Sequence, residues 1–565
     1  MLNQRWKKYE KKETKKLQQT IPNVDLEKHK NDKLSGNLED TIAFIKKYLG
    51  ENDDFYIHHF RVFGKFQAAI IFLSSLVDKR TINLEVLKPL MYIPQHLEGK
   101  TIEQDQVNEI LLNDILYNSQ GILEDHLADL IDVLLFGRTV VLIEGINEAI
   151  TIETLQVDKR SIEQPPTDQV IRGPRDGFIE SLQTNLALIR FRLHSPDFRV
   201  KITTTGKESK VKVGICYIKG IAHPDLVKEV NDRISAIEID AVLDVGYLEQ
   251  LIEDHHFSPF PQIANTERPD KVVAQMLEGR VCILIDGSPF ALIVPAVFTQ
   301  FYQSTEDYSE RFLMGTLVRI IRLVALLFAL VFTSLYVSII SFNPELIPTD
   351  FAVAVAGGRA GVPFPTVIEV LIMEISMEVL REATIRLPQQ VGGALSIVGV
   401  LVIGQAAVSA GFVSPITVVV IALTTIGSFA TPAYNAAIAL RMLRFPLVIL
   451  AGIFGLYGVM VGLILIINHM LSLKSFGVPY MAPIVPGNFE GMKDTLIRAP
   501  LWWMPKRPSF FHSDNKTRLS KDSLSKIKEP PSNTLDPMKV GNERWDDTDG
   551  ISSTNNSDPS DDRHI

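Results

Sequence analysis

Four ionisable side chains with helical spacing stand out in an otherwise apolar stretch of the sequence. They are Glu374, Glu378, Arg381 and Glu382. At 100° per residue they fall on one face, within roughly a third of a helix circumference. Because a charge in hydrocarbon is costly, such groups face a protein interior or water and are functional candidates. In a symmetric oligomer they would form rings of carboxylates, which line cation-selective pores. The alternative is an interfacial helix on which Glu378 and Arg381 only pair with each other.

A segment rich in glycine and proline, residues 357–365, comes directly before these charges. Glycine and proline interrupt regular helices, and irregular backbone at membrane depth persists only where protein or water satisfies its polar groups. We therefore expect a re-entrant or pore-lining segment here. The residues that we expect to line or gate a pore are Gly361, Pro363, Phe364, Pro365, Glu374, Glu378, Arg381 and Glu382.

Long apolar runs around this segment predict membrane helices, since a spanning helix needs about 20 apolar residues. The runs are 323–340, 394–411, 415–431 and 445–467. If residues 365–387 also cross the bilayer, five crossings put the C-terminal tail outside; otherwise four crossings leave both termini in the cytoplasm. Basic residues behind the last run favour four crossings, whereas Arg441 and Arg444 would then face outward. We expect four crossings.

The part before the first apolar run alternates strand-like and amphipathic segments, which is typical of α/β or α+β domains. Residues 138–144 and 211–218 predict strands, and residues 224–237 and 245–255 predict helices. We expect an α/β soluble region of two subdomains, followed by an α-helical polytopic membrane domain. The expected segments are a basic disordered tail (1–40), a first subdomain (41–160), a second subdomain (161–316) that opens with a Pro/Gly linker (161–174), the membrane domain (317–485) and a largely disordered polar tail (486–565).

The chemical motifs of common enzyme classes are missing from the sequence. It carries no Walker loop, dinucleotide fingerprint, His-Glu-x-x-His or Cys-x-x-Cys motif. Cys216 and Cys282 each lie in a strand-like apolar run, where we expect buried thiols and neither a disulfide nor a metal site. The sequence therefore predicts a protein that is not an enzyme, with no cofactor and no metal.

Several motifs, in order, resemble the A subunits of nutrient germinant receptors of the GerA family from endospore-forming bacteria. The resemblance covers roughly residues 40–490. Its motifs are Arg160-Ser-Ile-Glu-Gln-Pro165, Val170-Ile-Arg-Gly-Pro-Arg-Asp-Gly-Phe-Ile-Glu-Ser181, Asn185-Leu-Ala-Leu-Ile-Arg190, Gly361-Val-Pro-Phe-Pro365, Glu378-Val-Leu-Arg-Glu-Ala383 and Gly392-Gly-Ala-Leu-Ser-Ile-Val-Gly399. Gln164 and Asp176 are conservative departures from the family pattern.

The resemblance implies a multi-pass subunit of the spore inner membrane whose large N-terminal domain is cytoplasmic. It implies assembly with a transporter-like B subunit, a lipoprotein C subunit, further A subunits and membrane lipid, without nucleic acid. The implied function is a germinant-gated cation channel that triggers germination; the alternative is a scaffold that relays the signal without conducting. Arg172, Arg175 and Arg190 are candidates for contacts between subunits, or are satisfied within one chain.

Overall fold

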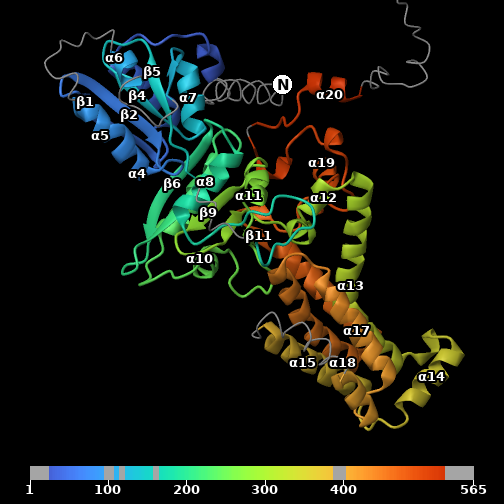
Figure 1. Ribbon diagram of the computed structural model, residues 1–565. Coiled ribbons are helices and arrows are strands. Elements are labelled where there is room, and N and C mark those ends of the chain that lie inside the picture. Colours follow the sequence, from blue (N-terminus) through green and yellow to red (C-terminus); the bar gives the residue numbers. More distant parts are fainter. Residues whose placement is uncertain are drawn as a thin grey trace, which may run out of the picture. The chain divides into compact units, whose positions relative to one another are not determined.

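The computed structural model describes residues 25–93, 107–112, 121–156, 164–385, 402–513 and 515–528 (Figure 1). The basic residues before 25, the first part of the linker, residues 394–401 of the expected helix 394–411 and the end of the polar tail lie outside the described residues. In the rest, we call residues 25–156 lobe 1, residues 164–311 lobe 2, residues 312–472 the helical region and residues 473–513 the return segment.

Lobe 1 is built on one antiparallel sheet of five strands. The strand order is β1-β2-β4-β5-β3, and every neighbouring pair is antiparallel. The chain runs through α3 (Leu38–Leu49), β1 (Phe55–Val62), β2 (Phe66–Leu73), α4 (Lys79–Thr81), the π-helical turn η2 (Ile82–Leu87), α5 (Lys88–Met91), α6 (Val107–Ile110), β3 (Ile122–Glu124), α7 (Leu127–Leu135), β4 (Arg138–Ile143) and β5 (Ala149–Glu153).

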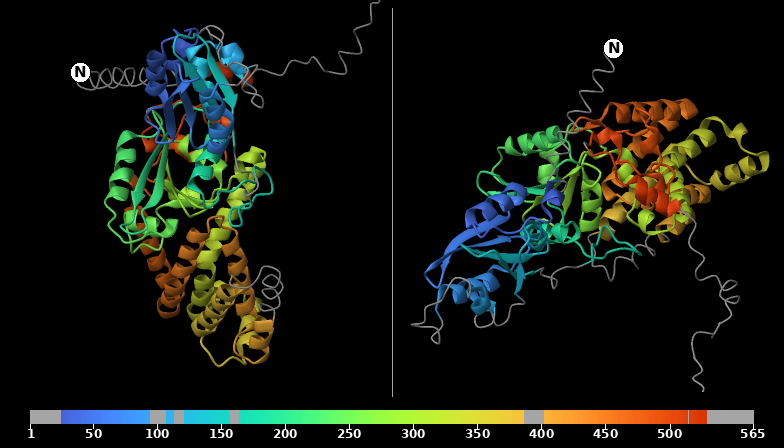
Figure 2. Two further views of the ribbon diagram at one scale, coloured as in Figure 1. Left: turned by 60° about the vertical axis from the view of Figure 1, so that its left-hand side comes forward. Right: turned by 90° about the horizontal axis from the view of Figure 1, so that it is seen from above.

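Lobe 2 repeats this arrangement. Its strand order is β6-β7-β9-β10-β8, and every neighbouring pair is again antiparallel. In both lobes, therefore, the strands counted along the chain lie side by side in the order first, second, fourth, fifth, third. The elements are α8 (Leu182–Arg192), β6 (Phe198–Thr205), β7 (Val211–Ile218), α9 (Pro224–Ser235), α10 (Val245–Ile252), β8 (Ala264–Thr266), α11 (Pro269–Met276), β9 (Val281–Ile285), β10 (Ala291–Val294) and α12 (Glu306–Ser309). Figure 2 shows the blue-to-cyan strands of lobe 1 next to the green strands of lobe 2. The predicted strands β4 and β7 and helices α9 and α10 are confirmed.

The two lobes share hydrogen bonds as well as strand order. In lobe 1, the amide of Leu38 at the start of α3 donates to the carboxylate of Glu144, the residue after β4, over 2.9 Å. In lobe 2, the amide of Leu182 at the start of α8 donates to Asp286, the residue after β9, over 2.9 Å. A glycine with positive φ follows each carboxylate, at Gly145 and Gly287. The two lobes are therefore copies of one structural unit.

The sheet of lobe 2 has a helix layer on each face, because alternate strand residues point in opposite directions. Cys216 and Cys282 lie opposite each other on β7 and β9 and pack with residues of α8 and α11. Ile215 and Ile283, each next to one of these cysteines and paired with each other across the same strands, pack with α9 and α10. Both cysteines are buried free thiols, as predicted.

The helical region follows lobe 2 without a break. It comprises α13 (Phe312–Phe342), η8 (Pro344–Leu346), α14 (Thr349–Arg359), α15 (Thr366–Ile385), α17 (Pro415–Phe429) and α18 (Tyr434–Ser472). Residues 402–409, before α17, are also helical. Within the described chain, α13 and α18 are long and apolar enough to cross a membrane.

Helix α18 folds back on itself at Gly455. This residue leaves the helical conformation with φ 61° and ψ −142°, a region open to glycine alone. A Cβ on Gly462 would lie 3.4 Å from Cγ of Leu447, although fifteen residues of straight helix span about 22 Å. The two halves therefore pack side by side, and the run 445–467, expected to form one span, contains this bend. Small residues allow this close antiparallel contact.

Both ends of α18 meet lobe 2. At its start, the amide of Ala433 donates to the carbonyl of Phe301 over 3.3 Å. Near its end, the ring of His469 lies 2.9 Å from the hydroxyl of Ser258. The chain therefore leaves the helical region next to the lobe from which it entered.

The return segment packs on lobe 2, although composition places residues from 486 onward with a disordered tail. Its hairpin of β11 (Lys474–Ser475) and β12 (Val478–Pro479) is anchored by the Ser475 hydroxyl, which donates to the carbonyl of Gln262 over 2.6 Å. Further along, Arg507 donates to the carbonyl of Leu277 over 2.7 Å. A few apolar and arginine side chains in this otherwise polar segment are therefore enough to dock it on lobe 2.

Residues 25–40, which were also expected to be a tail, bury Leu26, Leu34 and Leu38 in lobe 1. Residues from Leu519 form a separate unit that contains α20 (Lys521–Lys528).

Candidate functional site

Helix α15 carries its charges into the interior of the helical region. Glu374 is 6% exposed, and both of its carboxylate oxygens accept from Nη1 of Arg444 on α18, over 2.6 and 2.9 Å. Arg444 is itself 3% exposed. Charge-assisted bonds of this length are strong, so the two side chains form a buried ion pair. Arg444, which the expected four crossings would place on the outer side, therefore pairs with Glu374, one of the carboxylates expected to line a pore.

One helical turn further along, the charges are less tightly matched. The side chain of Glu378 is 45% exposed and lies 3.4 Å from Nη1 of Arg381 and 3.5 Å from Nε of Arg441. Arg381 also reaches the hydroxyl of Ser428 on α17 over 3.3 Å. Glu382 is exposed on the same helix. The structure therefore places all four predicted charges on α15, and the exposure of the carboxylates increases from Glu374 through Glu378 to Glu382.

Glu369 is a buried carboxylate that the sequence analysis did not select. It is fully buried and accepts from Arg359 at the end of α14, with 3.0 Å between Nη2 and Oε1. Its other oxygen accepts from the amide of Ser414 and the hydroxyl of Thr417, each over 3.1 Å. A carboxylate beside a helix N-terminus is favoured by the helix dipole. Ser414 and Pro415 mark the start of a helix, whose first backbone amides have no partner within the helix. Nothing in the sequence indicated which carboxylate would accept from them.

The glycine- and proline-rich segment is only partly irregular. Gly357 and Gly358 lie inside α14, and the chain leaves helical structure over residues 360–365. The ring of Phe364 stacks on that of Phe412 with an interplanar angle of 10°. A Cβ on Gly411 would lie 3.2 Å from the carbonyl oxygen of Gly361. The predicted residues 361–365 thus form a connection between α14 and α15 that touches the turn before α17.

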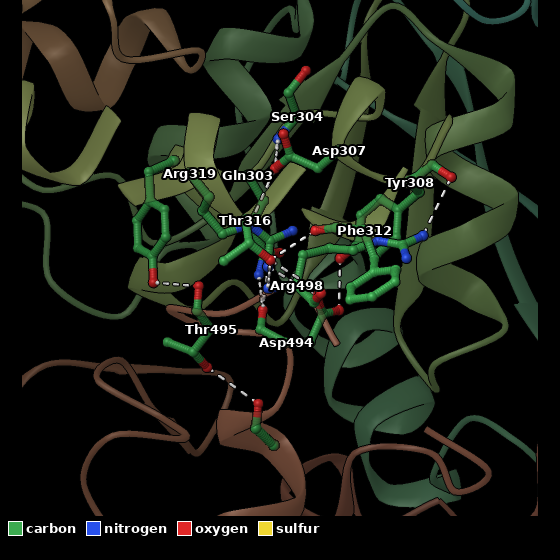
Figure 3. Close-up of polar contacts among 12 residues, drawn as sticks. Gln303, Ser304, Asp307, Tyr308, Phe312, Thr316, Arg319, Asp494, Thr495 and Arg498 are labelled. Atoms are coloured by element: carbon green, nitrogen blue, oxygen red, sulfur yellow. Dashed lines mark hydrogen bonds and ion pairs between the residues drawn. The ribbon is translucent and has the colours of Figure 1, made fainter. Parts of the chain in front are cut away.

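A second charged cluster joins lobe 2, α13 and the return segment (Figure 3). Asp307 of α12 is 2% exposed and lies 3.2 Å from both Arg319 and Arg322 of α13. Nη1 of Arg319 also donates to Asp494 of the return segment over 2.9 Å. The hydroxyl of Tyr308 donates to the second oxygen of Asp494 over 2.6 Å. We call these residues and Arg498 the junction cluster.

The three arginines proposed for subunit contacts occupy different environments. Arg190 on α8 is 1% exposed and donates two hydrogen bonds, of 2.7 and 2.8 Å, to Asp54 of lobe 1. Arg172 is exposed and lies 3.7 Å from Glu310. Arg175 is exposed as well. Arg190 therefore joins the two lobes of one chain, while Arg172 and Arg175 remain at the surface.

Glu249 is an acidic side chain of lobe 2 whose pKa is strongly raised. Burial on α10 raises the pKa of Glu249 to about 7, and the nearby carboxylates of Glu253 and Asp244 raise it further. Among the described residues, no group of three or more His, Cys, Asp or Glu side chains could hold a metal ion.

Comparison with known proteins gives consistent relatives. The family model described as Bacillus/Clostridium GerA spore germination protein matches residues 43–510. Spore germination protein KA of Bacillus subtilis (strain 168) is 42% identical over 86% of this chain and 89% of its own length. Spore germination protein GerLA of Bacillus cereus is 40% identical over 86% of this chain and 98% of its own length.

A crystal structure of the N-terminal domain of the A subunit of the Bacillus megaterium spore germinant receptor GerK3 covers 47% of this chain. It aligns over 98% of its own length at 33% sequence identity, with a TM-score of 0.38. The family model and the two full-length relatives span both lobes and the helical region. On these matches, the chain belongs to the GerA family of spore germination proteins.

Proposed function

We propose that this chain is the A subunit of a membrane nutrient-germinant receptor, and that copies of it assemble into a germinant-gated cation channel. The family and its relatives support a role in spore germination, and the two long apolar helices support association with a membrane. The observation that carries the channel is the charged face of α15, which lies among apolar helices and becomes more exposed toward Glu378 and Glu382.

In this proposal, the carboxylates of neighbouring subunits surround a common path. Glu378 and Glu382 line it, because their side chains are not enclosed within one chain. Glu374 stands behind them, neutralised by Arg444. Carboxylate rings select cations by favourable electrostatics. The connection 361–365, with Gly361, Pro363, Phe364 and Pro365, is the segment that moves when the path opens.

The proposed receptor contains a transporter-like B subunit that holds the nutrient and a lipoprotein C subunit. The A subunit lies in the spore inner membrane with several crossings, and its lobes lie on the core side. Arg172 and Arg175 are available to a neighbouring subunit since they are exposed. We assign Arg190 to the contact between lobes. The role is not enzymatic and requires no cofactor.

A non-conducting scaffold is the second candidate. The pairing of Glu374 with Arg444 favours it, because two buried opposite charges that satisfy each other fix helix positions without any ion path. In that case the junction cluster would relay the movement of lobe 2 to a partner, and a separate channel would conduct.

Potassium flux through liposomes that contain the purified chain separates these functions. Glu378→Gln should reduce the flux several-fold, because it removes a charge from the proposed path, while the amount of assembled protein stays the same. Glu345→Gln, which alters an exposed carboxylate outside α15, is the matched control. If the unaltered chain conducts no more than empty liposomes, the channel is rejected in favour of the scaffold.

A charge exchange tests Glu374 separately. Glu374→Arg combined with Arg444→Glu keeps the buried pair but reverses it. If Glu374 only positions helices, the exchange restores the assembly and flux that either single change removes. If its charge contributes to selectivity, assembly returns but the preference for cations weakens.

A further inference from the structure

A cavity of about 470 Å³ lies where α15, α17 and α18 approach lobe 2. Its lining combines two arginines with hydroxyl groups and aromatic rings. The polar and aromatic residues that define it here are Arg381, Thr425, Ser428, Phe429, Tyr434 and Arg441. Thr167 from the linker of lobe 2 closes one side. The cavity is therefore at the end of the helical region nearest the lobes.

The two arginines of this cavity share one carboxylate at long range. Charged groups with a large effect on Arg381 are Arg441, Arg444, Glu374 and Glu378. Glu374 is already committed to Arg444. Glu378 is shared by Arg381 and Arg441, at 3.4 and 3.5 Å. A buried positive charge that shares its counter-charge is costly unless a further anion compensates it.

Arg441 is buried but only loosely paired. It is 8% exposed, and its Nε makes no hydrogen bond among the described residues; its contact with Glu378 at 3.5 Å is an ion pair. Its guanidinium carries five N–H donors in a planar fork that matches the oxygens of a phosphate. The hydroxyl of Ser428 accepts from Arg381 over 3.3 Å and donates to the carbonyl of Thr425 over 2.6 Å, so it helps to hold the guanidinium of Arg381 in place. The polar part of the cavity is therefore suited to an anion that accepts several hydrogen bonds.

The rim of the cavity is suited to an amphiphile. Phe429 and Tyr434 line it and are 69% and 53% exposed. Two of the helices that line the cavity carry further exposed apolar residues, since Ile426 on α17 and Val379 on α15 are 67% and 64% exposed. Exposed apolar groups beside a basic pocket between membrane helices, with an aromatic residue at the boundary, are features of sites for anionic lipid headgroups.

We propose that this cavity binds the phosphate of an anionic phospholipid, with Arg381 and Arg441 as its ligands and the acyl chains against the apolar rim. The lipid supplies the counter-charge that Glu378 provides only in part, and it links α15 and α18 at the end nearest lobe 2. The inference rests on membrane insertion, which is part of the proposed function, and does not depend on conduction.

Lipid retention by the full chain tests this inference. The chain is reconstituted in nanodiscs of phosphatidylcholine alone or with phosphatidylglycerol, and bound lipid is counted by native mass spectrometry after transfer to detergent. We expect retained phosphatidylglycerol, and about a tenfold loss of affinity in Arg441→Gln, the scale of one lost charge-assisted contact. Ser428→Ala is a milder second variant that removes one hydroxyl. Arg311→Gln, an exposed arginine before α13, is the control for non-specific attraction.

The arms of the experiment have distinct outcomes. Equal retention by the unaltered chain, Arg441→Gln and Ser428→Ala would overturn the site. Stabilisation by inorganic phosphate to the same melting temperature as by phosphatidylglycerol would overturn the lipid as the source of the phosphate. Failure of the unaltered chain to enter nanodiscs would instead refute membrane insertion, and with it the proposed function.

Discussion

At the scale of residues, the chain repeatedly buries an arginine against a carboxylate from a distant part of the sequence. Arg190 meets Asp54, and Arg444 meets Glu374. The residue types were visible in the sequence, and α15 was singled out by its spacing. The partners were not predictable, because these pairs are separated by 136 and 70 residues and only the folded chain brings them together.

The Arg190–Asp54 pair gives a stability prediction. Arg190→Met should lower the free energy of unfolding by about 3–5 kcal/mol, because it leaves Asp54 buried without its counter-charge. Adding Asp54→Asn should recover much of the loss. Thermal unfolding of the full chain in detergent, followed by circular dichroism, measures both. Arg172→Met is the exposed control, and an equal loss there would contradict the assignment.

Glu249 gives a pH prediction. Burial raises its pKa to about 7 from an ordinary value near 4.5, so the folded chain binds this proton more tightly than the unfolded chain does. The stabilisation is complete below pH 4.5 and is lost as the pH rises through 7, by about 2–3 kcal/mol. Glu249→Gln should flatten the dependence of the melting temperature on pH across this window. The exposed Glu208→Gln should leave it unchanged, and a flat profile in the unaltered chain would refute the prediction.

At the scale of elements, sequence patterns identified individual strands and helices well, but not their duplication. Strands β4 and β7 and the start of α17 followed from local patterns. The repeat had a signal, since the pattern Gly-Arg-x-x-x-Leu-Ile-acidic-Gly occurs at 137–145 and again at 279–287. Strand order depends on pairing between distant segments, which local patterns do not specify. The reversal in α18 was missed because glycine within an apolar run also fits ordinary helix packing.

Gly455 allows this reversal to be tested. Gly455→Ala should destabilise the helical region by about 1–3 kcal/mol, because φ 61° with ψ −142° is strained for alanine. Its Cβ would also lie 3.0 Å from Cγ of Phe342. We expect a lower melting temperature and less monodisperse protein after detergent extraction. Gly357→Ala, in open helical surroundings, should be neutral or stabilising, and equal behaviour of the two variants would disprove the reversal.

At the scale of the whole molecule, lobe 2 is the part to which the other described parts of residues 25–513 attach. Lobe 1 joins it through Arg190, α13 through Asp307, and the return segment through Gln262. Composition predicted the order of soluble and apolar regions along the chain. It could not predict that residues after 486 dock on lobe 2, since the contact of Arg507 with Leu277 joins groups 230 residues apart.

The junction cluster predicts that lobe 2 and the helical region unfold together. Asp494→Ala should separate them into two calorimetric transitions, because Arg319 and Tyr308 both lose a carboxylate partner. Limited proteolysis should then cleave the return segment sooner. Glu490→Ala, whose partner is the neighbouring Lys493, serves as the control. An unchanged single transition in Asp494→Ala would show that the cluster does not couple the two parts.

The meeting of both ends of α18 with lobe 2 has a consequence for biosynthesis. If the helical region is inserted as we propose, the described segments on the distal side of the bilayer are short: residues 343–365, which contain the eleven-residue helix α14, the connection 410–414 and the bend at Gly455. No folded domain would have to be translocated, so helices could enter the translocon as hairpins while the lobes fold at the ribosome's own side. A glycosylation acceptor engineered at residue 346 would then be modified during synthesis into microsomes, and one engineered at residue 487 would not.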